Sequence, residues 1–152
     1  MNITEKGYQL IKHYEGCKLH SYQDGVGVWT IGYGNTFYPN GVKVRANESI
    51  TQNQAELMLP AVVARFEKTV TSCLFKSATP QQFDAMVSLC YNIGGANFKR
   101  SSLVRLFNEG NSMASQYFLL YIKAGGKVVR GLENRRRSEK YLFDTGELKY
   151  FN

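Results

Sequence analysis

The sequence predicts an α+β fold in which a small antiparallel β lobe and a larger helical lobe make up one domain, residues 1–152. Residues 18–36 are rich in glycine, aromatic and β-branched residues, which is typical of a small sheet, whereas helical periodicity dominates elsewhere. A chain of this length suits one domain that buries about two-thirds of its unfolded surface. We expect the β lobe at about residues 16–50, the helical lobe at 1–15 and about 61–152, and a cleft between them.

The first helix is expected between Thr4, a suitable N-cap, and Gly16, a suitable helix end. Small and apolar residues recur between them at helical spacing, at Gly7, Leu10, Ile11 and Tyr14. After the sheet of residues 18–36, a Pro-Asn-Gly turn at 39–41 leads into a short extended segment at 42–44.

Capping boxes predict two helix starts, at residues 51–54 and at residues 79–82, the second with proline at the first helical position. Pro60 should kink the first of these helices or begin a new one. The second is apolar nearly all round, which favours the buried centre of the helical lobe. Further helices are expected at residues 102–108, 112–123 and 132–143.

Composition limits the function. The net charge of +7 favours anionic partners such as bacterial envelope polymers, nucleic acid or acidic lipid, although it also aids solubility. Three cysteines are an odd number, so we expect no disulfide framework and interpret Cys17, Cys73 and Cys90 as small fillers or surface residues of a chain kept in a reducing compartment. With two histidines in the chain, neither a metal site nor a cofactor is predicted.

Three residues within residues 14–35 carry the chemistry of a glycosidase. Cleaving a glycosidic bond takes one carboxyl that stays protonated and a second that stays ionised on the other side. Glu15 ends a helical pattern and can be partly buried, whereas Asp24 opens an Asp-Gly turn and should be exposed and charged. Thr30 lies in the strand that follows, where its hydroxyl can hold a water beside Asp24. Taken singly, these residues also suit a helix end, a turn and a strand.

The spacing of Glu15, Asp24 and Thr30, with Thr-Ile-Gly-Tyr-Gly at residues 30–34, resembles the catalytic signature of the phage-type lysozymes, glycoside hydrolase family 24. Later motifs follow in family order, at residues 88–94 (SLCYNIG), 98–103, 124–126 and 131–139. Many family members have histidine where this chain has Asn35, so an ion pair made by that histidine is not expected here.

The resemblance implies a lysozyme-like fold and an N-acetylmuramidase (EC 3.2.1.17) that hydrolyses the β-1,4 bond between N-acetylmuramic acid and N-acetylglucosamine in peptidoglycan, with inversion. It also implies that Arg135, or Arg136 if the register slips by one, pairs with the catalytic glutamate, although all three arginines at 135–137 equally suit a solvated helix. Residues implied to contact sugar are Tyr91, Asn92 and Ser102, for which core packing and helix capping are the alternatives.

By the same resemblance, the protein is a monomeric endolysin. It waits in the host cytoplasm until a separate holin-type protein permeabilises the membrane. The polar, helical start of the sequence predicts neither a signal sequence nor a membrane anchor. Three alternatives remain: a lytic transglycosylase, a non-catalytic wall-binding module on the same fold, and nucleic-acid binding, which the sequence disfavours because no nucleic-acid module surrounds the basic run.

Overall fold

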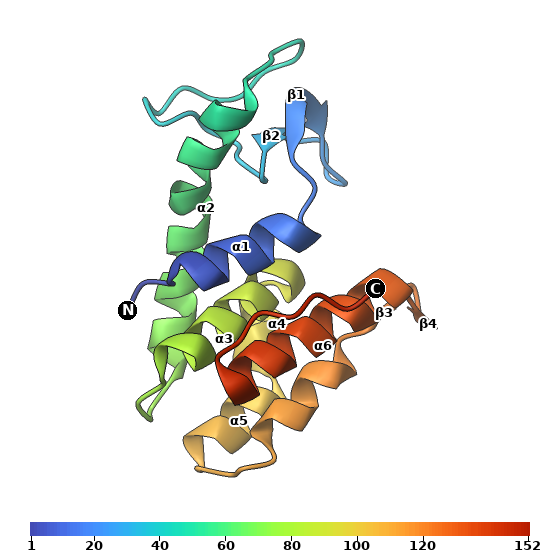
Figure 1. Ribbon diagram of the computed structural model, residues 1–152. Helices are drawn as coiled ribbons and strands as arrows, with labels where there is room; N and C mark the ends of the chain where they lie inside the picture. The colour runs from blue at the N-terminus through green and yellow to red at the C-terminus, as the bar shows by residue number, and fades with distance from the viewer. The chain divides into compact units, whose positions relative to one another are not determined.

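A computed structural model describes residues 1–152, which divide into two compact units. Unit 1 consists of Met1–Ile11 and Phe66–Asn152, and unit 2 consists of Lys12–Arg65. Helices dominate and the sheets are small and antiparallel, which confirms the predicted α+β class (Figure 1). No helix combines the length and the apolar character needed to span a membrane.

Helix α1 (Glu5–Tyr14) is fixed at its start by carboxylates from distant parts of unit 1. The backbone N–H of Thr4 donates to Asp84 Oδ1 at 2.8 Å, and the Thr4 hydroxyl donates to Asp84 Oδ2. One residue earlier, the N–H of Ile3 donates to Glu67 Oε2 at 2.7 Å. The helix therefore begins directly after Thr4, as predicted. The Thr4 hydroxyl, however, donates to Asp84 instead of capping the helix.

Unit 2 contains the hairpin of β1 (Lys18–Gln23) and β2 (Trp29–Gly32), as predicted. Tyr22 pairs with Thr30, and the register shifts at an irregularity between Lys18 and Tyr22. On the other side of β1, His20 forms an isolated bridge with Ser49. Three buried side chains form the core beneath the hairpin, namely Ile31, Val44 and Met58.

The loop after β2 has the predicted turn but not the predicted extended segment. Gly41 N donates to the Tyr38 carbonyl at 2.9 Å, which closes the turn at residues 39–41. Residues 42–44 form no strand and contribute only a bridge between Phe37 and Lys43.

Helix α2 (Gln52–Cys73) begins at the predicted capping box, in which Gln54 N donates to Thr51 Oγ1 at 3.1 Å and Thr51 N donates to Gln54 Oε1 at 2.8 Å. It continues through Pro60, so the expectation that a new helix begins there is wrong. Pro60 is exposed, and so is Glu56 one turn earlier. Proline has no N–H to donate to the Glu56 carbonyl, and that carbonyl can be hydrated instead.

Unit 1 is built around α3 (Pro80–Ile93) and α6 (Arg130–Thr145), which pack against each other (Figure 1). The predicted capping box of α3 is present in both directions, with Pro80 at the first helical position. Every residue from 83 to 90 is buried, so the prediction of a central buried helix is confirmed.

The rest of unit 1 departs from the sequence prediction in places. Helix α5 (Ser102–Asn108) lies where it was predicted, but the short helix α4 (Gly95–Lys99) was missed. In place of a helix at 112–123 there is a 3-10 helix, η1 (Ala114–Leu120). Residues after it form a small hairpin of β3 (Lys123–Ala124) and β4 (Lys127–Val128).

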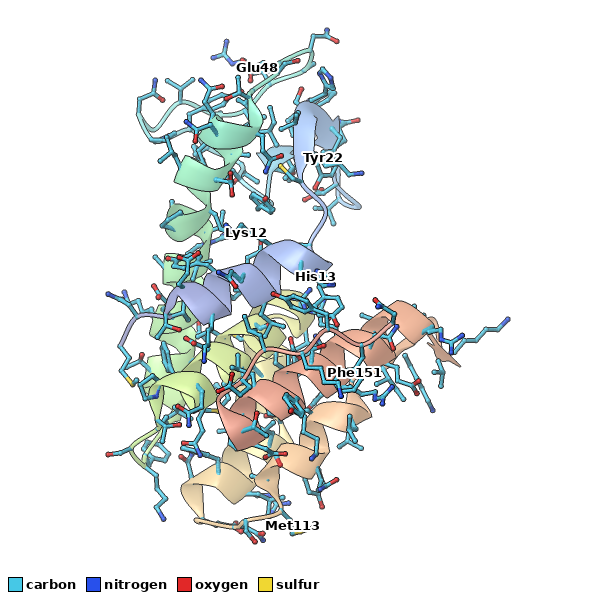
Figure 2. All side chains as sticks on the ribbon, viewed as in Figure 1. Lys12, His13, Tyr22, Glu48, Met113 and Phe151 are labelled. Atoms are coloured by element: carbon cyan, nitrogen blue, oxygen red, sulfur yellow. The ribbon has the colours of Figure 1, made fainter.

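Gly125 and Gly126 explain that hairpin, because their φ angles of 59° and 79° allow a two-residue turn that other residues rarely make. The chain ends by returning along α6, where the Arg137 guanidinium lies 4.2 Å from the centre of the Phe151 ring (Figure 2). The basic side of α6 thus stacks on the carboxyl-terminal segment.

We predict that Gly7→Ala destabilises the protein although it improves helix propensity. A Cβ at Gly7 would lie 2.9 Å from Asp84 Oδ1 and 3.0 Å from Ile3 Cβ, so the anchor of α1 would have to move. Overpacking of this kind costs about 1–3 kcal/mol of unfolding free energy, measurable by urea denaturation. The matched control is Gly131→Ala in α6, where no atom lies within 4 Å and a gain of about 0.5–1 kcal/mol is expected. Equal effects of the two substitutions would contradict the packing argument.

Asp84 should also give a pH-dependent stability. Burial raises the pKa of its carboxyl above the ordinary 3.8, against hydrogen bonds from Thr4 and Gly7 that lower it. A folded pKa above the unfolded one contributes stability below pH 3.8, and that contribution is lost as pH rises through the folded pKa. In Asp84→Asn this loss should be absent, so the difference in unfolding free energy between wild type and variant should shift against the wild type as pH rises from 3 to 7. If the unfolding free energies of wild type and Asp84→Asn change in parallel with pH, the proposed contribution of Asp84 is refuted.

Candidate active site

The β1–β2 hairpin fixes the backbone of Asp24, the first residue of the connecting turn. Asp24 N donates to the Val28 carbonyl at 3.0 Å, which continues the ladder past the strand ends. Gly27 N donates to the Asp24 carbonyl, also at 3.0 Å, and the φ of Gly27 is +84°, a value that favours glycine. Asp24 is therefore held by the turn that its sequence predicted.

The carboxylate of Asp24 is exposed and is oriented by the same turn. Its Oδ1 accepts hydrogen bonds from the N–H groups of Val26 and Val28, each at 2.9 Å. These two donors fix the plane of the carboxylate, and Oδ2 makes no hydrogen bond within the protein. The exposed state confirms the environment predicted for Asp24, and Oδ2 is the oxygen available to a ligand or a water.

Thr30 lies in β2 and is 4% exposed. Its hydroxyl donates to the Val28 carbonyl at 2.9 Å. Because that bond uses the only hydroxyl proton, the oxygen can act toward a water only as an acceptor. A water held by Thr30 would therefore donate one proton to it and direct a lone pair elsewhere.

Glu15 follows the last residue of α1 and is half-buried, as predicted. Its position relative to Asp24 is indicated by Tyr22. Burial is the main cause that raises the pKa of the Tyr22 phenol, and the negative charges of Asp24 and Glu15 raise it further. Both carboxylates therefore lie within electrostatic range of one phenol, whose residue pairs with Thr30 across the hairpin.

Sequence reasoning did not select Tyr22 as a site residue. The signal that could have identified it is the hairpin register, since a turn centred on residue 26 places residue 22 opposite residue 30. A phenol within electrostatic range of two carboxylates can donate a hydrogen bond to a carboxylate or to a sugar hydroxyl.

The cysteines contribute to packing. Cys17 is half-buried and lies within hydrogen-bonding reach of the Tyr33 hydroxyl, which also accepts from Gln52 Nε2 at 3.0 Å. Cys73 and Cys90 are buried, and burial raises the pKa of the Cys90 thiol to about 12. A thiol with that pKa stays protonated and unreactive. No group of three or more His, Cys, Asp or Glu residues is placed to hold a metal ion.

Arg135 belongs to a buried charge cluster in unit 1. Its Nε donates to Glu139 Oε2 at 3.2 Å, and its Nη2 donates to the Ser88 carbonyl at 3.2 Å. Arg136 meets the same carboxylate, with Nε 2.6 Å from Glu139 Oε1 and Nη2 3.1 Å from Oε2. The alternative of three solvated arginines is therefore wrong for Arg135 and Arg136 and correct for Arg137, which is exposed.

The other residues predicted to bind sugar also belong to unit 1. Tyr91 is half-buried near the end of α3, with its ring centre 5.1 Å from that of Phe66. Asn92 is half-buried in the last turn of α3. Ser102 is half-buried at the start of α5, where the N-cap is Ser101. The pairing of Arg135 with Glu15 and the sugar contacts of these three residues stay predictions.

Asn35 occupies a buried position in unit 2, 4% exposed. Its Nδ2 donates to the Met58 carbonyl at 3.1 Å, and its backbone pairs with that of Ile31. Its Oδ1 is buried without a hydrogen-bond partner. The amide therefore ties the end of the hairpin to α2 without a charge.

Comparison with known proteins places this chain in a family. Residues 12–139 match the family model described as phage lysozyme. The endolysin of Bacillus phage PZA is 41% identical over 152 residues, which cover 98% of this chain and 57% of that protein. The chain thus spans little more than half the length of the Bacillus phage endolysins it matches. The endolysin of Acyrthosiphon pisum secondary endosymbiont phage 1 is 40% identical, with 95% of this chain and 99% of that protein covered.

Solved structures confirm the lysozyme-like fold. An endolysin from Escherichia coli O157:H7 phage FAHEc1 matches with a TM-score of 0.84 and 33% sequence identity. The match covers 98% of this chain and 97% of that one. The similarity therefore extends over both units and includes the hairpin that carries Asp24 and Thr30.

The charge cluster yields a prediction for unit 1. Glu139→Ala should cost about 3–5 kcal/mol of unfolding free energy, because it leaves two buried guanidinium groups without their shared carboxylate. Asp144→Ala on the same helix is the control, since it removes an ion pair with Lys140 at the surface and should cost at most about 1 kcal/mol. Chemical denaturation measures both, and a small effect of Glu139→Ala would show that the cluster contributes little to stability.

Proposed function

Because this chain belongs to the phage lysozyme family, we propose that it is an endolysin that hydrolyses the β-1,4 bond between N-acetylmuramic acid and N-acetylglucosamine in bacterial peptidoglycan. The observation that supports the proposal is that Asp24 and Glu15 both lie within electrostatic range of Tyr22, whose backbone pairs with that of Thr30 across the hairpin. That the two units act together as one catalytic domain is part of the proposal.

The two carboxyls would take different roles because their surroundings differ. Glu15 is half-buried at the end of α1, and we assign to it the transfer of a proton to the leaving oxygen. Asp24 is exposed, with one oxygen held by two N–H groups, which suits an ionised carboxylate on the opposite side of the sugar. Asp24 Oδ2 would then accept a proton from the attacking water or stabilise the positive charge that develops on the sugar.

Thr30 would position that water. Since its hydroxyl proton is used by the Val28 carbonyl, the water must donate one proton to Thr30 and can donate the other to Asp24. Such a water keeps both of its lone pairs, and one of them can attack the anomeric carbon. Direct attack by this water would invert the anomeric carbon, which is the stereochemistry that the family resemblance implies.

Unit 1 would supply the remaining sugar contacts and the partner of the acid. We include Tyr91, Asn92 and Ser102 as sugar-binding residues, and Arg135 as the residue that orients Glu15. The Glu139 carboxylate and the Ser88 carbonyl hold the Arg135 guanidinium in one orientation, as a positioning role requires.

The proposal extends to how the protein reaches its substrate. A net charge of +7 favours association with the anionic bacterial envelope. We propose that the protein stays in the host cytoplasm, acts as a monomer, and reaches the wall once a holin-type protein has opened the membrane.

We predict that Glu15→Gln and Asp24→Asn each reduce lytic activity by about 10²–10⁴-fold, the range expected when a positioned acid or base is lost. The measurement is the fall in turbidity of bacteria stripped of their outer membrane. Glu109→Gln is a matched control, since Glu109 is exposed and pairs only with Arg105 at the surface. Full activity of either site variant in correctly folded protein would overturn the assignment.

Product analysis separates hydrolysis from the lytic transglycosylase alternative, which needs the acid but no water-activating aspartate. Hydrolysis should yield reducing N-acetylmuramic acid ends, initially as the inverted anomer by NMR. Anhydro-sugar products, together with undiminished activity of Asp24→Ala, would instead identify a transglycosylase. Purified protein that binds cell walls without cleaving them would identify a non-catalytic module.

A further inference from the structure

One cavity of unit 2 is lined by residues other than those of the candidate active site. It has a volume of about 490 Å³, which is within the usual range for small-ligand pockets. Neither Glu15, Tyr22, Asp24 nor Thr30 lines it. Figure 2 labels Glu48, one of its lining residues, in the loop that precedes α2.

Three walls of the pocket are fixed in place. The segment from Glu48 to Ile50 is joined to β1, because Ser21 N donates to the Glu48 carbonyl and Ile50 N donates to the Leu19 carbonyl. The first turns of α2 form the second wall and the Tyr38-Pro39 turn forms the third. The site is therefore formed before any ligand arrives.

The interior combines an apolar floor with an exposed apolar rim. Met58 belongs to the core of unit 2, and Tyr38 and Ile50 pack against that core. Leu57, by contrast, is 72% exposed, an unusual state for a leucine beside a preformed cavity. Apolar surface of this kind suits the flat face of a pyranose ring or the methyl of an acetamido group.

Two polar groups are oriented along the walls. Glu48 Oε1 accepts from the Tyr38 hydroxyl at 2.9 Å and from Arg45 N at 2.7 Å, and these bonds lower the pKa of the Glu48 carboxyl. Glu48 Oε2 is left as an acceptor. Gln54 Oε1 is engaged by Thr51 N, so its Nε2 is left as a donor.

We propose that this pocket is an accessory binding site for an N-acetylglucosamine residue of the glycan. Glu48 Oε2 accepts from a sugar hydroxyl, Gln54 Nε2 donates to the acetamido carbonyl, and the methyl lies against the apolar floor. The ionised carboxylate disfavours anionic ligands, so the site selects N-acetylglucosamine over N-acetylmuramic acid with its free lactyl carboxyl. The proposal rests on the proposed function, because that function supplies the glycan.

The test uses the full chain with Glu15→Gln, so that no glycan is cut. Triacetylchitotriose is titrated into ¹⁵N-labelled protein, and the backbone amides of Ser49, Ile50 and Leu57 should shift. N-acetylmuramic acid at the same concentration should leave them unchanged. Shifts confined to residues about Tyr22 would place the sugar only at the candidate active site and would overturn the proposal.

Two further variants test the pocket itself. Glu48→Gln keeps the acceptor that holds Tyr38 and Arg45 but replaces Oε2 by a donor, and Leu57→Ser removes the exposed rim. Each should weaken binding at the pocket about tenfold, as expected for one lost charged hydrogen bond or one lost apolar contact. The control is Phe75→Ser, since Phe75 is 85% exposed and lies in unit 1. Unchanged affinity in both pocket variants would refute the site.

The outcomes separate this proposal from the proposed function. If wild-type protein fails to hydrolyse peptidoglycan while the amides of Ser49, Ile50 and Leu57 still shift with triacetylchitotriose, the proposed hydrolase activity is refuted and the proposed accessory site is supported. If hydrolysis is observed and these amides never respond, the accessory site alone is wrong.

Discussion

The pairing of Tyr22 with Thr30 is the constraint on which the candidate site depends. Side chains alternate between the two faces of a strand, so a slip of one residue would move Thr30 to the opposite face and change the distance from Asp24 to Glu15. The turn prevents that slip, because Asp24 Oδ1 binds two of its N–H groups and Gly27 adopts a left-handed φ. One carboxylate therefore takes part in both the folding of the hairpin and the chemistry we assign to it.

Unit 1 is organised about a charge rather than about apolar packing alone. Two guanidinium groups, of Arg135 and Arg136, share the carboxylate of Glu139 in the interior, and the Ser88 hydroxyl donates to the same carboxylate. Removing such groups from water is costly, and the cost is offset only when their hydrogen bonds are well placed. The packing of α3 on α6 therefore tolerates few alternatives, because any shift between the helices separates Ser88 from Glu139.

Several elements of the fold could be predicted from the sequence. Capping boxes located the starts of α2 and α3, and the Asp-Gly turn located the hairpin, because these signals act within a few residues. Most of the predicted helix at 112–123 is a 3-10 helix at 114–120, and the turn at Gly125 and Gly126 places its last predicted residue, Lys123, in a strand. The chemistry that we propose for Glu15 and Asp24 rests on residue type, spacing and the family resemblance. The electrostatic contact of Tyr22 with both carboxylates and the burial of Arg135 and Arg136 could not be predicted, since register and tertiary partners decide them.

The anchoring of the first residues bears on the order in which the chain can fold as it leaves the ribosome. Unit 2 is one contiguous stretch, whereas α1 begins in a unit whose other residues start at Phe66. The carboxylates that receive the N–H groups of Ile3 and Thr4 belong to Glu67 and Asp84. At about 5–20 residues per second, these partners emerge several seconds after the segment they secure. The segment of Ile3 and Thr4 therefore waits for its attachment until Asp84 has been synthesised.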